Sequence, residues 1–263
     1  MDLAGLAEVV PAEEARAATG NQPRSDIMET EKQINELVER LKGLAGENLN
    51  CVALFGSAVS REFHAGFSDI NVICIFRELT APALARLVPL MRWWTKKDFP
   101  APLLFTRKEL EKSADVFAIE LLDIRQSHRL LYGEDLFSNL HVPMNLHRVQ
   151  VEHNLRTKLL TLRQMYAQFA DDDQRVGRLM LDSVSNFATL FRHALITMGE
   201  KPGESKEENI QKLAARIHFD PAIFVRLLQV RAQKANEKDL DAHAGFAQYM
   251  EGIDKAIQAV DAL

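Results

Sequence analysis

The fold of this chain is decided by two stretches, Leu54-Phe55-Gly56-Ser57 and Phe67-Ser68-Asp69-Ile70-Asn71. A Gly-Ser turn after a strand can direct backbone N–H groups at a phosphate, because glycine lets the backbone approach closely and the serine hydroxyl adds a donor. Acids opposite that turn would hold Mg²⁺ against the same phosphates. The two stretches together therefore predict a phosphate and metal site.

Apolar runs of strand length adjoin both stretches. Cys51–Phe55 ends at Gly56, and residues 69–76 form a second run with β-branched residues. Their length and branching favour buried strands over helices. Asp69 and Asn71 are two residues apart, so they share one face of the second strand. We expect further strands at Leu103–Phe105, Val116–Ile124 and His128–Tyr132, and helices over 26–44, after Thr80 and after Thr106, where Glu109 completes a capping box.

Only helical periodicity follows Pro143. We expect helices over about 146–170, 174–198, 205–217, 221–234 and 237–262. The predicted fold class is α+β, with a mixed sheet and flanking helices followed by an all-α helical bundle. The expected domains are an N-terminal arm over 1–25, a sheet domain over 26–143 and a bundle over 144–263.

The Gly56-Ser57 turn and the Asp69-Ile70-Asn71 strand resemble the DNA-polymerase-beta-type nucleotidyltransferase superfamily over about residues 26–140. The sequence around Asp69 is similar to its bacterial branch of aminoglycoside-type and minimal nucleotidyltransferases. The resemblance implies that a nucleoside triphosphate binds with Mg²⁺ or Mn²⁺ through Gly56 and Ser57. It also implies transfer of a nucleoside monophosphate to an acceptor hydroxyl.

Asn71 departs from the family pattern, which is Asp-x-Asp or Asp-x-Glu. Its amide offers a carbonyl oxygen but no charge. At an effective dielectric of about 20, the lost attraction to a divalent ion is several kcal/mol, which as barrier height is orders of magnitude in rate. A slower or one-metal enzyme, a binding protein without transfer, and partial compensation by His64 all remain open.

The resemblance also implies a third acid on a later strand, for which Glu120 and Asp123 are the candidates. Three residues apart, they would face opposite sides of the strand predicted over Val116–Ile124. We favour Glu120, which would lie mid-strand and need a metal or a cation; an ion pair with an arginine is the alternative. The predicted catalytic and metal-binding residues are therefore Asp69, Asn71 and Glu120.

The bundle adds two weaker signals. Arg192 and His193 lie in the otherwise apolar stretch Phe187–Ile196, so at least one should meet a partner, and we take Arg192 as a candidate triphosphate contact. Arg148 and His153 have the spacing of a catalytic motif in helical ribonuclease-type bundles. That two-residue match arises often by chance and is given little weight.

Composition limits the classes of partner that the protein is expected to bind. Net charge is -5, which disfavours nucleic acid without excluding it. Apolar stretches are far shorter than the roughly 20 residues that cross a bilayer, and the N-terminus is unlike a signal peptide, so we expect a cytoplasmic protein without a membrane partner. Cys51 and Cys74 should be buried thiols. The acceptor is unidentified, and a homodimer is left open.

Two functional hypotheses follow from these residues. The favoured one is a nucleotidyltransferase with a degenerate metal site at Asn71. The alternative is a catalytically impaired nucleotide-binding or interaction module, a pseudoenzyme acting as a sensor or an antitoxin-like partner. A purely structural helical scaffold is a third reading, which nucleotide binding would eliminate.

Overall fold

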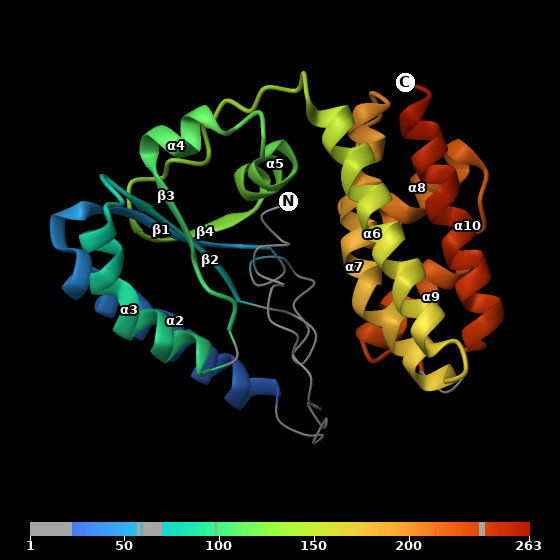
Figure 1. Ribbon diagram of the computed structural model, residues 1–263, viewed down its shortest axis with the longest axis horizontal. Coiled ribbons are helices and arrows are strands. Elements are labelled where there is room, and N and C mark those ends of the chain that lie inside the picture. The colour runs from blue at the N-terminus through green and yellow to red at the C-terminus, as the bar shows by residue number, and fades with distance from the viewer. Residues whose placement is uncertain (1–22, 57–58, 60–69, 98, 237–239) are drawn as a thin grey trace. The chain divides into compact units, whose positions relative to one another are not determined.

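The computed structural model describes residues 23–56, 59, 70–97, 99–236 and 240–263. The chain divides into two compact units, the first ending at Pro143 and the second beginning at Met144 (Figure 1). The first contains a mixed sheet with helices, and the second is helical throughout its described part. This is the predicted fold class. Residues 1–22 of the expected N-terminal arm lie outside the described residues.

The first unit is organised around strand β1 (Leu49–Phe55). β1 pairs antiparallel with β2 (Asn71–Phe76) on one side and with β4 (His128–Gly133) on the other. β2 in turn pairs parallel with β3 (Leu103–Thr106). The described strands therefore follow the order β3-β2-β1-β4, in which β1 and β2 are central.

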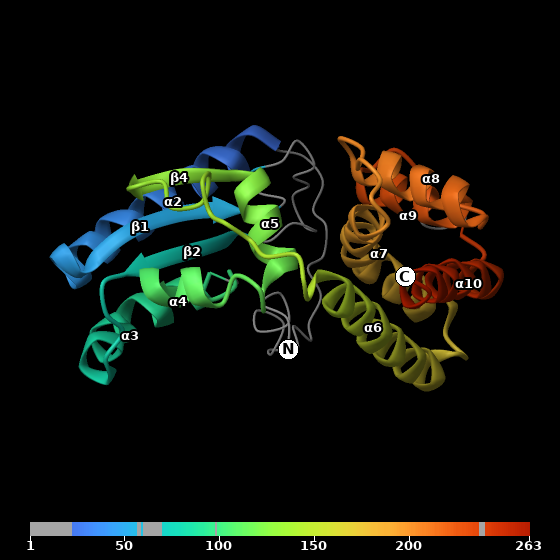
Figure 2. The ribbon, with the colours of Figure 1, turned by 90° about the horizontal axis from the view of Figure 1, so that it is seen from above.

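Helices cover both faces of this sheet (Figures 1 and 2). One face carries α2 (Pro23–Ala45) and α3 (Ala81–Thr95), and a short 3₁₀ turn over Gly46–Asn48 leads from α2 into β1. The opposite face carries α4 (Arg107–Lys112) and α5 (Ala118–Gln126). The capping box predicted for α4 is present, because Thr106 Oγ1 accepts from the Glu109 N–H and Glu109 accepts in return.

Alternate residues of β1 enter different cores. Ala53 packs in the α4/α5 core with Cys51, and Val52 packs in the α2/α3 core with Cys74. Both thiols are free and fully buried, as predicted. Burial raises the pKa of Cys51 to about 12 and also raises that of Cys74. Since successive side chains of a strand point to opposite faces, the two thiols belong to separate layers.

The strand predicted over Val116–Ile124 is wrong, because these residues lead into and form most of the helix α5. Ala118, Leu121 and Ile124 are buried in the α4/α5 core at a spacing of three residues, which is helical. The run is apolar and of strand length, but its Ala, Leu and Glu residues are strong helix formers. Burial of one helix face in the α4/α5 core therefore decides the conformation of this segment, although its apolar run has the length of a strand.

The second unit consists of five described helices around α7. They are α6 (His147–Phe169), α7 (Asp173–Thr197), α8 (Lys206–Ile217), α9 (Ala222–Arg231) and α10 (Ala242–Asp261). Phe187 and Phe191 of α7 contact Tyr249 and Phe224, respectively, at the centre of this unit. Each predicted helix is present, with ends shifted by at most five residues; residues 237–239 of the last predicted helix lie outside the described residues.

Within the described residues, no helix has both the length and the apolar character that a bilayer crossing requires.

Gly133 provides a stability test of the β1–β4 pairing. It ends β4 with φ +82°, and a Cβ there would lie 1.8 Å from the carbonyl oxygen of Asn50. We expect Gly133→Ala to lower the free energy of unfolding by at least about 3 kcal/mol, because left-handed strain adds to a backbone displacement.

The matched control is Gly43→Ala in α2, where nothing lies within 4 Å of the added Cβ. This substitution should raise stability by roughly 0.5–1 kcal/mol. Urea unfolding followed by circular dichroism measures both variants. A Gly133→Ala protein as stable as the wild type would show that this left-handed turn is not required.

Candidate functional site

Three strands bring a row of residues together at one end of the sheet. Phe55, at the end of β1, is paired with Asn71 of β2 on one side and with His128 of β4 on the other. Directly paired residues of antiparallel strands have side chains on the same face. Phe55 packs against the α4/α5 core, so Asn71 and His128 lie on the face that α5 covers.

Gly56 follows this row directly and lies near Asn71. Its φ is +73°, and a Cβ on it would lie 3.2 Å from the Asn71 amide nitrogen. The Gly56 carbonyl accepts from the Val59 N–H at 3.1 Å, so the chain turns here. The turn after β1 and the side chain at the start of β2 are therefore neighbours. The exposed Gly56 and an uncharged amide are therefore close together at this point.

Three residues of the predicted site lie outside the described residues: Ser57, His64 and Asp69. Their roles stay predictions. Among the residues that are described, no three His, Cys, Asp or Glu side chains gather closely enough to hold a metal ion. Asn71 is the described member of the Asp69–Asn71 pair, and its side chain carries no charge.

Glu120 and Asp123 lie on α5 rather than on a strand. The predictions that Glu120 lies mid-strand and that the two acids face opposite sides are therefore wrong. Residues three apart on a helix are neighbours on one side of it. Both side chains are half-buried, and both have polar or ionic partners. Glu120 remains a candidate third acid only as a prediction, now with Asp123 beside it on the helix over the same sheet face as Asn71.

His128 is a residue of this end of the sheet that sequence reasoning missed. One ring nitrogen, Nδ1, lies 2.8 Å from the Ile124 carbonyl oxygen, and Nε2 lies 3.1 Å from Asp135 Oδ1. Hydrogen bonds from Ser138 and from the Phe137 N–H lower the pKa of Asp135 to about 2, and His128 contributes in the same direction. His128 therefore links the end of α5 to the loop after β4. No sequence signal placed these residues together before the strand register was known.

Arg192 and His193 do meet partners, as predicted for at least one of them. A guanidinium nitrogen of Arg192, Nη2, lies 3.2 Å from His193 Nε2. His193 is fully buried, and its Nδ1 lies 2.8 Å from Nε2 of the buried His147. Arg192 thus belongs to a polar group inside the helical unit, and its role as a triphosphate contact stays a prediction.

The donors and acceptors of this group determine both histidine tautomers. A guanidinium only donates, so His193 Nε2 accepts and its Nδ1 carries the proton that reaches His147 Nε2. His147 Nδ1 then carries a proton and faces Thr197 Oγ1 at 3.4 Å. Burial, helped by Arg192, holds the pKa of His193 well below its ordinary value, and burial lowers that of His147 to about 4. Both rings are therefore neutral at pH 7.

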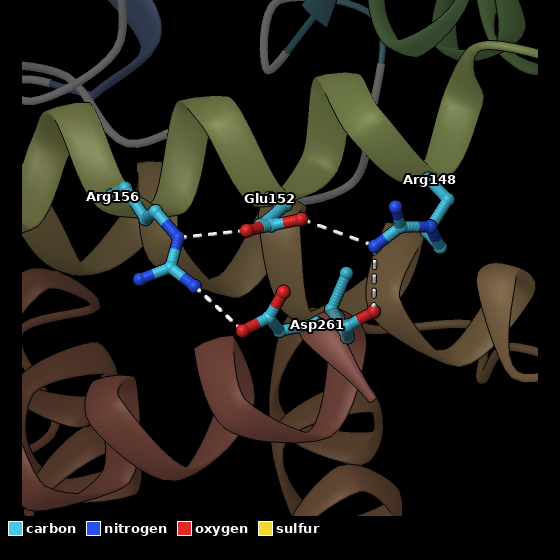
Figure 3. A network of polar contacts seen from close by, with 5 residues as sticks. Arg148, Glu152, Arg156 and Asp261 are labelled. Atoms are coloured by element: carbon cyan, nitrogen blue, oxygen red, sulfur yellow. Dashed lines mark hydrogen bonds and ion pairs between the residues drawn. The ribbon is translucent and has the colours of Figure 1, made fainter. Parts of the chain in front are cut away.

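Arg148 is part of an ionic network that joins α6 to α10 (Figure 3). Glu152 accepts from Arg148 at 3.0 Å and from Arg156 at 2.8 Å. Arg156 also donates to Asp261 at 3.0 Å, and Arg148 donates to the Val260 carbonyl at 3.2 Å. The two arginines hold the pKa of Glu152 below its ordinary value. These contacts give Arg148 a role in holding the two helices together.

His153 is exposed on α6, one residue beyond Glu152. Of the two residues with the ribonuclease-type spacing, His153 is therefore exposed to solvent, and Arg148 donates a hydrogen bond to Glu152. This arrangement provides no support for the ribonuclease reading.

Comparison with known proteins identifies the fold. No protein-family model matches the chain, and no curated protein matches it. Among solved structures, the chain is similar to spectinomycin adenyltransferase AAD(9) from Enterococcus faecialis, crystallised with ATP and spectinomycin. The similarity has a TM-score of 0.53 at 14% identity and covers 85% of this chain and 99% of that one. At this identity the likeness establishes a nucleotidyltransferase-like fold with a helical C-terminal region.

The buried histidine pair predicts how stability depends on pH. Between an unfolded pKa of 6.5 and a folded pKa of about 4, the unfolded chain binds a proton at His147 that the folded chain does not. The free energy of unfolding should therefore fall as pH falls through this window, by about 1.4 kcal/mol per unit. His193 acts in the same direction.

Urea unfolding at pH 7.5, 6 and 5 measures this effect. His147→Gln keeps an acceptor near the former Nε2 but cannot titrate, so its stability should depend less on pH than that of the wild type. His141→Gln, at an exposed position, is the matched control and should retain the wild-type slope. Equal slopes for all three proteins would contradict the neutral, buried pair.

Proposed function

We propose that this protein binds a nucleoside triphosphate with Mg²⁺ at the end of the sheet formed by β1 and β2, and transfers a nucleoside monophosphate to an acceptor hydroxyl. The observation that carries the proposal is the proximity of Gly56 to Asn71 across the β1–β2 pair, where a Cβ on Gly56 would lie 3.2 Å from the Asn71 amide nitrogen. The nucleotidyltransferase-like fold supports it, and the predicted phosphate-binding turn begins at Gly56, directly after β1.

The Gly56 turn would receive the phosphates. Because its left-handed φ suits glycine and a side chain there would approach Asn71 at 3.2 Å, the position keeps the backbone accessible. Ser57 would add a hydroxyl donor to the same phosphate. Binding at this turn would hold the α-phosphorus in line with the attacking hydroxyl, and positioning supplies much of the catalysis in phosphoryl-type transfer.

The donor set suits Mg²⁺, which prefers oxygen ligands. Asp69 would supply a carboxylate, Asn71 an amide oxygen, and Glu120 or Asp123 of α5 a third oxygen from the covered face. When bound, the ion would neutralise triphosphate charge. Asn71 would orient that site without adding charge, so Asp69 would provide most of the attraction.

The relative of known structure suggests which ligands to test first. Its structure contains ATP and spectinomycin, so we propose ATP as the first donor and small polyhydroxylated molecules, including spectinomycin, as the first acceptors. The Asp-x-Asn pattern favours a second candidate function, a nucleotide-binding module that does not transfer. A neutral residue in place of the second acid preserves a ligand oxygen but weakens stabilisation of the transition state.

Nucleotide binding is tested by thermal unfolding. ATP with Mg²⁺ at about 100 times its Kd should add about 2.7 kcal/mol and raise Tm by several degrees. Asp69→Ala should remove this rise, because the metal complex loses its principal carboxylate. Glu47→Ala is the control; this exposed acid precedes β1, at the strand end opposite Gly56, and its variant should keep the full rise. An unchanged rise in Asp69→Ala would place the nucleotide elsewhere.

Asn71→Asp separates the two candidate functions. If the site transfers nucleotides, restoring the acid should raise pyrophosphate release at least ten-fold, which corresponds to about 1.4 kcal/mol of barrier. Asn145→Asp, at an exposed position just before α6, adds the same charge elsewhere and should leave the rate unchanged. ATP binding without pyrophosphate release in either the wild type or Asn71→Asp would favour the binding module.

A further inference from the structure

One polar cluster belongs wholly to the helical unit and contains none of the residues of the site proposed above. It joins Tyr166 near the end of α6, Asp173 at the start of α7 and His243 at the start of α10. The Tyr166 hydroxyl lies 3.0 Å from His243 Nδ1, and His243 Nε2 lies 3.1 Å from Asp173 Oδ1. A hydroxyl, an imidazole and a carboxylate are therefore connected in sequence.

The direction of these hydrogen bonds follows from the carboxylate. An ionised carboxylate only accepts, so in neutral His243 the proton lies on Nε2 and is donated to Asp173. Nδ1 then presents its lone pair to the Tyr166 hydroxyl, which donates to it. A nucleophile within reach of a base, with the base oriented by a third group, is the arrangement that activates hydroxyls in covalent catalysis.

Packing holds the phenol ring in this position. The Tyr166 ring is half-buried and stacks on Phe246 with centroids 3.9 Å apart and an angle of 6° between the planes. His243 meets its ring edge-on at 6.2 Å. The His243 side chain is 50% exposed and that of Asp173 is 79% exposed. The cluster is therefore ordered by its aromatic contacts and accessible to a reactant from solution.

The neighbouring carboxylates serve the helix ends. Asp172 accepts from the Arg175 N–H at 3.0 Å, and Asp241 accepts from the Ala244 N–H at 3.0 Å. Each is an N-cap, of α7 and α10 respectively. Asp173 is engaged differently, because its carboxylate faces His243 from the first turn of α7. These carboxylates would repel a bare triphosphate, so a donor must arrive as its metal complex.

We propose that Tyr166 is an acceptor hydroxyl for the nucleotidyl group. The phenol oxygen forms a bond to the α-phosphorus of a nucleoside triphosphate, and the bond from that phosphorus to the α–β bridging oxygen breaks. Pyrophosphate leaves, and the phenol proton passes to His243 Nδ1, beside the Asp173 carboxylate. The product is a tyrosyl phosphodiester on this chain or on a second copy. The proposal rests on the proposed function for its donor.

The nucleophile itself is tested first, without nucleotide. The protein is treated with N-acetylimidazole, and acetylation of its three tyrosines is followed by peptide mass spectrometry. Tyr166 should react about ten-fold or more faster than Tyr132, which is half-buried with Lys42 over its ring and serves as the internal control. His243→Asn, which places an amide near Nδ1 but cannot take the proton, should abolish the difference.

Variants of Asp173 distinguish orientation of the base from simple packing. Asp173→Asn presents an amide N–H to His243, which favours the opposite tautomer and should lose the excess reactivity. Asp173→Glu keeps the carboxylate and should recover part of it. Equal acetylation of Tyr166 in the wild type, His243→Asn and Asp173→Asn would overturn the proposal.

Transfer is then tested with ATP and Mg²⁺ or Mn²⁺ on the full chain, by intact mass and peptide mapping. One adenosine monophosphate on Tyr166, absent from Tyr166→Phe and reduced at least ten-fold in His243→Asn, supports the proposal. Pyrophosphate release with an external acceptor, but without a label on Tyr166, overturns the acceptor role and leaves the proposed function intact. If no triphosphate turns over with any acceptor, the proposed function fails and the acceptor role fails with it, whereas the acetylation result stands separately.

Discussion

The first unit depends on the burial of β1 on both edges and both faces. β1 pairs antiparallel with β2 and β4, and its alternate residues pack into the α2/α3 core and the α4/α5 core. The register of such a strand is fixed, because a slip of one residue would move every side chain of β1 to the opposite face of the sheet. Its end is therefore a defined place, where Phe55 aligns Asn71 with His128 and the chain turns at Gly56. The position of β1 therefore determines how the residues of the candidate site are arranged.

Features that depend on a few neighbouring residues could be predicted from the sequence. The Thr106–Glu109 capping box and the strand over residues 51–55 are both present, because short-range hydrogen bonding and an apolar run of strand length determine them. The sequence does not predict helix α5, because its apolar residues fit a strand as well as a helix. Packing of Leu121 in the α4/α5 core identifies the buried face of the helix. Of the candidate site, the Gly56–Asn71 neighbourhood follows from the strand pair, whereas the roles of Ser57, Asp69 and Glu120 stay predictions.

The sequence does not identify which residues meet through long-range packing. His147 and His193 are 46 residues apart and meet only because α6 packs on α7. His128 and Asp135 meet because β4 begins beside the end of α5 and the chain then returns. A lone histidine in a sequence does not show whether its nitrogens will face donors, acceptors or water. In the described structure, the ring nitrogens of His193 face a guanidinium and a second imidazole ring. Those of His128 face a backbone carbonyl and a carboxylate.

The two thiols on opposite faces of the sheet have a consequence for how the unit opens. Cys51 and Cys74 lie on adjacent strands, yet one is covered by α4 and α5 and the other by α2 and α3. Neither can be alkylated while its own helical layer is in place, and departure of one layer leaves the other thiol protected. The natural sequence thus carries one chemical reporter for each layer, so the order in which the layers separate can be read from which cysteine is modified first.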